Sequence, residues 1–175
     1  MEDDEDSMSS KLLYASPEEA DSRAAGREDV AFWFAFSQEE KISFLIRAGE
    51  MLDSCMVWNG VPSVAGQELR WPRRGVLDAD GMPLSETVIP EAVKHAVCEQ
   101  AFFLSDPEVR KLRRFRRTGI KSAAMGGLSL SVNAENSGEK IATEALDCIR
   151  MFGHLRSDCS ETKQGGTVCG TLLRG

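Results

Sequence analysis

Basic side chains dominate one short stretch of the sequence. Six of the eight residues from Arg110 to Arg117 are basic, and no acidic residue occurs between Arg110 and Lys121. Basic side chains can neutralise phosphates without reading bases, but arginine pairs with carboxylates equally well. The segment therefore predicts a contact with DNA, a contact with an acidic partner, or a solvated helix face. The residues concerned are Arg110, Lys111, Arg113, Arg114, Arg116 and Arg117.

Aromatic residues are scarce within this basic segment, where Phe115 is the only one. Proteins that bind single-stranded DNA usually place aromatic side chains among the basic ones, so that bases can stack on them. The segment by itself therefore lacks a stacking platform, which counts against a function in single-strand binding.

Two acidic motifs have residue types that could bind a metal ion. Asp78-Ala79-Asp80-Gly81 has the start of a calcium loop, but the later ligand, glycine and glutamate positions of an EF-hand hold Met82, Pro83 and Ile89. We therefore expect a turn at this motif.

The second motif is on a predicted helix. His95 lies four residues from both Glu91 and Glu99, so the three side chains share one helix face. Because the apolar stripe of that helix lies on another side, we expect a solvated, charge-paired histidine and no metal site.

Signatures of catalysis are missing from the sequence. Gly165-Gly166-Thr167 lacks the frame of a phosphate-binding loop, and no serine lies in a Gly-x-Ser-x-Gly elbow. We expect no catalytic residue, no metal and no cofactor, and hence a protein that is not an enzyme.

The five cysteines show no Cys-x-x-Cys spacing, which favours neither a disulfide framework nor a zinc site and fits a reducing cytosol. Cys55 and Cys98 fall on or beside apolar stripes and are predicted to be core residues. Cys159 and Cys169 are predicted to be exposed thiols.

Charge is distributed unevenly along the 175 residues, whose net charge is −7. Residues 1–11 are acidic and serine-rich, so we expect a disordered arm there rather than a signal peptide. No apolar run reaches the roughly 18 residues that a membrane span needs, so we expect a soluble protein without a membrane partner.

Capping boxes predict the first two helices. Ser16 with Glu19 precedes a helix from Pro17 towards Ala25, and Ser37 with Glu40 precedes a second one that ends near Trp58. The second helix carries one apolar stripe. Its members are Ile42, Leu45, Ala48, Leu52, Cys55 and Met56.

The second half of the chain predicts further helices and a strand. Pro90 opens a helix that closes at Ser105, and Pro107 permits a restart through Arg117. Alternation from Leu128 to Asn133 predicts a half-buried strand without an evident partner. Residues 136–138 are predicted to cap a last helix, which Gly153 stops.

These elements predict a mainly α fold. We expect a small bundle of about four helices, a long shaped loop, one short β strand or hairpin arm, and flexible tails. The predicted divisions are an arm at 1–11, a helical domain at 12–153 and a C-terminal docking tail at 154–175.

The shaped loop contains Trp71-Pro72-Arg73-Arg74-Gly75 and leads to the helix start Ile89-Pro90. Trp71 and Pro72 could present a binding edge or pin the loop onto the helices, and Gln67 and Leu69 fit the second role. The order of these motifs after Tyr14–Asp21 resembles the head-to-tail connector (adaptor) proteins of tailed bacteriophages, which are often described as DnaT-like ssDNA-binding proteins.

This resemblance covers residues 13 to about 152 and implies a structural protein of the virion neck, assembled in the host cytoplasm. It implies a ring of about twelve copies beneath the portal protein, which extends the DNA channel and attaches tail or nozzle proteins. The C-terminal segment would bind the portal through Val168, Leu172 and Leu173. The strand residues Leu128, Leu130 and Val132 would contact the neighbouring subunit.

In the ring, the basic segment would contact genomic DNA without sequence specificity, or an acidic partner. A second hypothesis from another class is a single-stranded-DNA-binding accessory protein of replication, which would use the same arginines without forming a ring. Aromatic side chains interleaved with the arginines would favour this second hypothesis.

Overall fold

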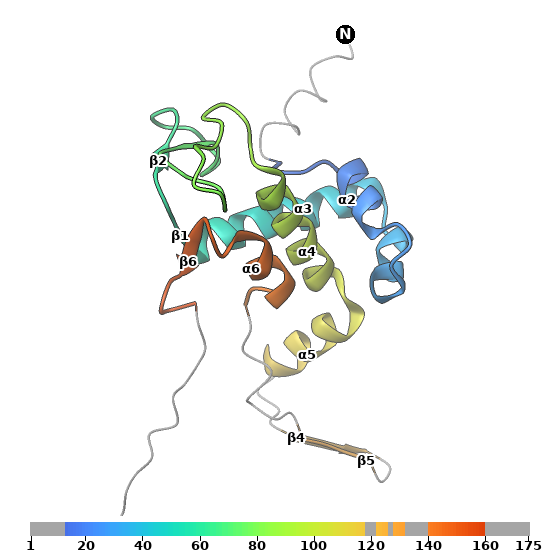
Figure 1. Cartoon of the computed structure of the whole chain (residues 1–175). Coiled ribbons are helices and arrows are strands. Elements are labelled where there is room, and N and C mark those ends of the chain that lie inside the picture. Colours follow the sequence, from blue (N-terminus) through green and yellow to red (C-terminus); the bar gives the residue numbers. More distant parts are fainter. Residues whose placement is uncertain (1–12, 118–121, 126–127, 132–139, 160–175) are drawn as a thin grey trace, which may run out of the picture.

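The computed structural model describes residues 13–117, 122–125, 128–131 and 140–159, and it is mainly α, as predicted (Figure 1). The helical elements are α2 (Pro17–Ala24), the 3-10 helix η2 (Glu28–Ala35), α3 (Gln38–Cys55), α4 (Glu91–Ser105), α5 (Pro107–Arg117) and α6 (Thr143–Ile149). The strands are β1 (Met56–Trp58), β2 (Val61–Pro62), β3 (Arg73–Arg74), β4 (Ser122–Met125), β5 (Leu128–Ser131) and β6 (Gly153–Leu155). None of the described helices is long and apolar enough to cross a membrane.

Helix α4 occupies the centre of the bundle. It packs against α3 and α6, and also touches α2, η2 and α5 (Figure 1). The predicted apolar stripe of this helix is buried throughout. Its burial extends further, because Cys98, Glu99 and Gln100 are buried as well. A helix covered on several sides needs partners for its polar residues.

Both predicted capping boxes are present. The backbone N–H of Glu19 donates to the Ser16 hydroxyl over 3.2 Å, and that of Glu40 donates to the Ser37 hydroxyl over 3.3 Å. In return, each glutamate side chain accepts from the backbone of its serine. Local hydrogen bonds therefore set the start of α2 and α3.

The end of α3 differs from the prediction. The helix stops at Cys55, three residues before Trp58, because the next three residues pair as β1 with β6 in an antiparallel sheet. In this sheet Trp58 faces Gly153. A Cβ at Gly153 would overlap the carbonyl oxygen of Val57, so the glycine permits the close approach of the strands and does not stop a helix.

The last helix is shorter than predicted, and its cap is different. Helix α6 begins after Ala142, so the predicted cap at residues 136–138, which lie outside the described residues, is wrong. Gln100 of α4 instead fixes the residues that precede the helix, because its side chain accepts from the Ala142 N–H over 2.8 Å and donates to the Lys140 carbonyl over 3.0 Å. A tertiary contact therefore fixes the start of the helix, and the local sequence pattern could not predict it.

The predicted boundary before His154 falls inside β6. His154 pairs with Val57, and the backbone N–H of Arg156 donates to the Cys55 carbonyl over 2.8 Å. Residues 154–159 therefore continue the fold instead of beginning a tail.

Trp71 pins the long loop onto the helical body, which decides between the two predicted roles. Its side chain is buried and stacks edge-on against Trp58 at 5.7 Å and Phe152 at 5.5 Å between ring centroids. Nearby, the buried Arg73 donates to the carbonyls of Asn59 and Gly60, each over 2.7 Å. Anchoring therefore uses both stacking and backbone hydrogen bonds.

The loop also contains the predicted turn, whereas the hydrogen bonds of Gln67 lie within the loop and, contrary to the prediction, do not pin it onto the helices. The Asp78 carboxylate accepts from the backbone of Asp80 and Met82, which closes the turn. The Gln67 amide donates to the carbonyls of Leu69 and Pro72.

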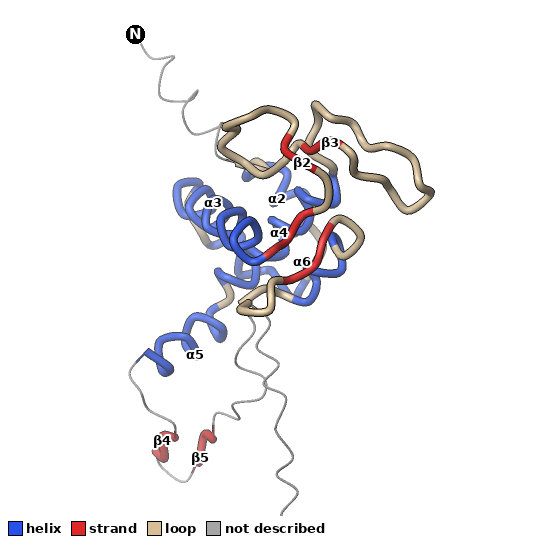
Figure 2. The backbone as a smooth tube through the Cα atoms, turned by 90° about the vertical axis from the view of Figure 1, so that its left-hand side faces the viewer, coloured by secondary structure: helices blue, strands red, loops and turns tan. Residues whose placement is uncertain are grey.

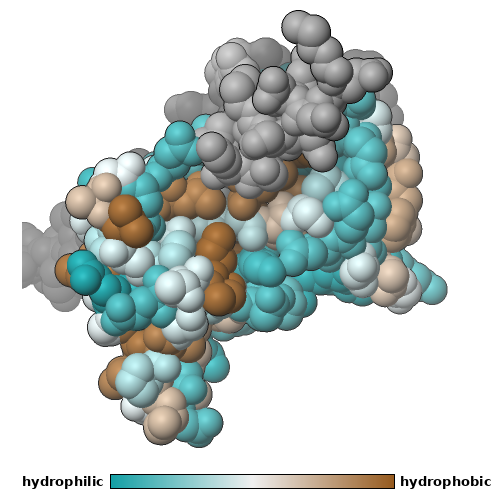
Figure 3. Space-filling view, turned by 90° about the horizontal axis from the view of Figure 1, so that it is seen from above, coloured by the Kyte–Doolittle hydropathy of each residue, from teal (hydrophilic) through white to brown (hydrophobic). Residues whose placement is uncertain are grey.

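Figure 3, which looks onto the molecule from above, shows several separate apolar patches among hydrophilic surface.

The predicted strand has a partner within the chain. Strand β5 pairs antiparallel with β4, with Ser122 opposite Ser131 and Met125 opposite Leu128. Figures 1 and 2 show this hairpin standing apart from the helical body, beyond α5. The outcome matches the predicted hairpin arm.

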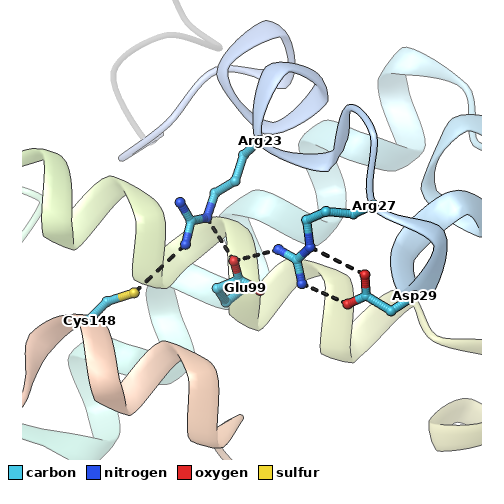
Figure 4. Close-up of polar contacts among 5 residues, drawn as sticks. All are labelled: Arg23, Arg27, Asp29, Glu99 and Cys148. Carbon is cyan, nitrogen blue, oxygen red and sulfur yellow. Dashed lines mark hydrogen bonds and ion pairs between the residues drawn. The ribbon is translucent and has the colours of Figure 1, made fainter.

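Glu99 ties two segments to the central helix (Figure 4). Its carboxylate is 6% exposed and accepts from Arg23 of α2 and Arg27 beside η2, each over 2.7 Å. Arg27 also pairs with Asp29 over 2.7 Å. Of the predicted motif, His95 is exposed, as expected, whereas Glu99 is buried, because two arginines distant in sequence reach its carboxylate.

We predict that Glu99→Ala lowers the free energy of unfolding by about 3–5 kcal/mol, because it leaves two partly buried guanidinium groups without their shared carboxylate. Asp29→Asn, which removes only the exposed partner of Arg27, should have a much smaller effect. Urea unfolding at neutral pH measures both. Equal unfolding midpoints for the two variants would contradict the assigned role of Glu99.

A second carboxylate, the half-buried Asp53 of α3, joins the N-terminal segment to the loop. It accepts from the Tyr14 hydroxyl over 2.7 Å and from the Trp58 indole N–H over 3.2 Å. Burial raises the pKa of Asp53 above its ordinary value, and the pKa of Tyr14 is raised by burial and by the neighbouring carboxylate.

A raised pKa in the folded state means that folding favours the protonated form of Asp53. The contribution of this group to stability is therefore largest below its unfolded-state pKa of about 4 and is lost as the pH rises through the folded-state value. We predict that wild type loses stability relative to Asp53→Asn as the pH rises from about 4 to 7. A difference in unfolding free energy that stays constant over this range would contradict the assignment.

Candidate nucleic-acid interface

Helix α5 begins directly after the central helix. Asp106 ends α4 and caps α5, because its carboxylate accepts from the backbone N–H groups of Glu108 over 2.7 Å and Val109 over 3.3 Å. Pro107 takes the first helical position, as predicted. One aspartate and one proline therefore redirect the chain and carry α5 beyond the bundle towards the hairpin (Figure 2).

The predicted basic residues all lie on α5. Arg110, Lys111 and Arg114 are exposed, whereas Arg113 is half-buried. Arg116 and Arg117 belong to the last turn, and their side chains lie outside the description. Lys111 has a loose ion pair of 3.8 Å with Glu108. The helix therefore presents cationic groups to solvent, while residues 13–105 contain 15 acidic and 8 basic side chains.

Aromatic rings from other elements lie beside these arginines. The guanidinium of Arg110 is 6.0 Å from the ring centroid of Phe36 and 5.9 Å from that of Phe44. Arg113 is 5.3 Å from the ring centroid of Phe103 on α4. Such distances fit cation–π contacts.

The arginines of α5 therefore have aromatic neighbours besides Phe115. These rings belong to the C-terminal cap of η2, to α3 and to α4, which lie outside the basic segment of the sequence. The sequence signal for Phe36 was the aromatic run from Phe32 to Phe36, which falls on η2 and its C-terminal cap.

The side chain of Trp33 packs against Phe36 and Phe44. Its ring is fully buried, 6.4 Å from the centroids of Phe36 and Phe44 and 5.0 Å from that of Phe102. Its indole N–H donates to Asp21 over 2.7 Å. Phe34 is 52% exposed and borders this group of rings through Lys41, whose ammonium lies 5.6 Å from the Phe34 ring and 5.8 Å from the Trp33 ring. We name the exposed ring of Phe34 and the half-buried rings of Phe36 and Phe44 the aromatic patch.

The other predicted contact residues fall partly or wholly outside the described part. Leu128 and Leu130 are in β5, whose backbone alone is described. Val132 and the predicted portal-binding residues Val168, Leu172 and Leu173 lie outside the described residues. The contacts predicted for these residues therefore stay predictions.

The described cysteines differ in their burial. Cys55 and Cys98 are buried, as predicted, and burial raises their pKa to about 11 and about 12. Cys159 is half-buried, and its thiol shares a hydrogen bond with Cys55, so the prediction of an exposed thiol is wrong for this residue.

A pocket of about 500 Å³ lies between α2 and α4, and its lining includes Arg23, His95 and Cys98. Of its charged groups, Lys94 contacts Glu19 over 2.8 Å and Glu91 over 3.0 Å, and Arg23 contacts Glu99 over 2.7 Å. Among the described residues, no group of three or more His, Cys, Asp or Glu side chains could hold a metal ion.

A family model described as "Putative DnaT-like ssDNA binding protein" matches residues 10–169. The chain therefore belongs to this family. Neither the curated proteins nor the solved structures include a match to this chain.

The contact of Arg110 with the aromatic patch predicts a small contribution to stability. Arg110→Gln should lower the free energy of unfolding by about 0.5–1 kcal/mol, the range of an exposed cation–π contact. Arg114→Gln removes an exposed arginine from the same helix and is the matched control. Urea unfolding of both variants measures the difference, and equal stabilities would show that the contact is energetically neutral.

Proposed function

We propose that the protein binds single-stranded DNA, with the exposed basic residues of α5 contacting the phosphates. The supporting observation is the basic helix itself, which carries Arg110, Lys111 and Arg114 into solvent at the edge of an acidic body. The description of the family agrees with this function. Binding of this kind needs no catalytic group.

The charge distribution favours one orientation of the DNA. The acidic body repels the phosphate backbone, whereas α5 attracts it, so a strand is directed to the helix and away from the remaining surface. Each neutralised phosphate releases condensed counterions, which makes the affinity depend steeply on salt. The rings beside α5 offer faces for unpaired bases.

We predict that a variant with Arg110, Lys111, Arg113 and Arg114 changed to glutamine binds a single-stranded oligonucleotide much more weakly and with a smaller salt dependence. Each lost phosphate contact lowers the slope of log affinity against log salt by about 0.7 for a single strand, so four contacts lower it by roughly 3. Fluorescence anisotropy at several salt concentrations measures both quantities.

The matched control changes four exposed arginines elsewhere to glutamine. They are Arg47, Arg70, Arg74 and Arg150. Both variants lose the same charge, so only an α5-specific contact separates them. If the two variants lose affinity equally, DNA responds to net charge alone and α5 is not the binding element.

A second candidate function is that of a phage head-to-tail adaptor, which the hairpin supports. Strands β4 and β5 pair with each other and stand apart from the body, so their outer edges can accept a strand from a neighbouring subunit (Figures 1 and 2). In a closed ring this contact would involve Leu128, Leu130 and Val132, and Val168, Leu172 and Leu173 would bind the portal protein.

The two candidate functions differ in the partner that they need. An adaptor assembles on the portal in the virion neck and attaches tail proteins, whereas a replication accessory protein needs only the strand. Negative-stain microscopy of the protein with and without portal protein distinguishes them. Rings that form on the portal, combined with negligible oligonucleotide affinity, would replace the DNA-binding proposal with the adaptor function.

A further inference from the structure

The aromatic patch contains an unusually accessible ring. Phe34 is 52% exposed, although Trp33 beside it is fully buried. Both belong to η2, which ends immediately before Phe36. A solvent-facing phenylalanine next to a buried tryptophan has a ring face that the monomer does not use.

The patch is held in place before any ligand arrives. Phe36 and Phe44 stack edge-on at 5.1 Å between centroids, and both rest on Trp33. Trp33 is fixed by its hydrogen bond to Asp21, which also accepts from Lys41 over 2.8 Å. A ligand that stacks on this patch therefore avoids much of the cost of ordering side chains.

Cationic groups border the patch on two sides. The ammonium of Lys41 is 5.6 Å from the Phe34 ring, and the guanidinium of Arg110 lies near the rings of Phe36 and Phe44. Arg110 begins the basic face of α5. Lys41 is buried and pairs with Asp21, so Arg110 supplies the exposed positive charge of this surface. An exposed phenylalanine ring and an exposed guanidinium match a polyanion that carries planar groups.

We propose that the aromatic patch is a nucleobase-stacking site, on which the unpaired bases of a single strand stack while α5 binds the adjoining phosphates. This inference rests on the proposed DNA-binding function and names the feature that would select single strands. Bases of a duplex are already stacked and paired, so they cannot reach the rings without paying for unstacking.

The experiment separates base contacts from phosphate contacts. Anisotropy titrations of wild type compare a thymidine 12-mer with a 12-mer of the same sugar–phosphate backbone that has no bases. Base stacking of about 1–3 kcal/mol corresponds to roughly 5–150-fold tighter binding of the thymidine strand. The Gln variant of α5 should lose affinity for both strands.

Phe34→Ala tests the patch itself, and the exposure of this side chain makes the variant compatible with folding. It should lose about 5-fold or more in affinity for the thymidine strand and keep its affinity for the abasic strand. Leu77→Ala, at a loop residue that is also 52% exposed, is the matched control and should change neither affinity.

Equal affinities of wild type for the two strands would overturn the stacking site and leave phosphate binding intact. Failure of wild type to bind either strand would overturn the proposed function together with the inference. If Phe34→Ala leaves both affinities unchanged but weakens self-association in sedimentation, the patch is a protein interface and the inference is wrong.

Discussion

The burial of α4 is the constraint on which the rest of the structure depends, and the carboxylate of Glu99 is its most demanding part. A charged group at 6% exposure in the middle of the bundle needs close partners, and Arg23 and Arg27 supply them from two different segments. The same ion pairs hold α2 and η2 on α4. Because η2 carries the aromatic patch and α4 leads directly into α5, this core arrangement sets the distance between the exposed rings and the basic helix.

Local signals predicted the helices well and their ends less well. The capping boxes at Ser16 and Ser37 were predictable because serine, glutamate and backbone lie within four residues. The start of α6 was not, since the hydrogen bond that fixes Ala142 comes from Gln100, 42 residues away. Strand β6 was missed for a similar reason: three residues pair with β1 only after the chain has folded back.

In the candidate site, too, local features were predictable from the sequence and long-range contacts were not. The basic cluster was evident from the sequence, because its members lie within one helix. The rings beside Arg110 were not evident, because they come from α3 and the C-terminal cap of η2, and the aromatic run from Phe32 to Phe36 also fits an ordinary core. Only the three-dimensional structure shows that Trp33 is buried and Phe34 exposed. The description of the family agrees with the proposal of DNA binding, and the adaptor function is the second proposal.

Photochemical cross-linking tests the central claim most directly, because it locates the bound strand on the chain. A single-stranded oligonucleotide with 5-bromodeoxyuridine cross-links efficiently to aromatic residues in contact with its bases, and mass spectrometry identifies the attached peptides. The account predicts cross-links at Phe34 to Phe44 and along α5. Cross-links confined to the loop between β1 and α4, or to the pocket between α2 and α4, would contradict it.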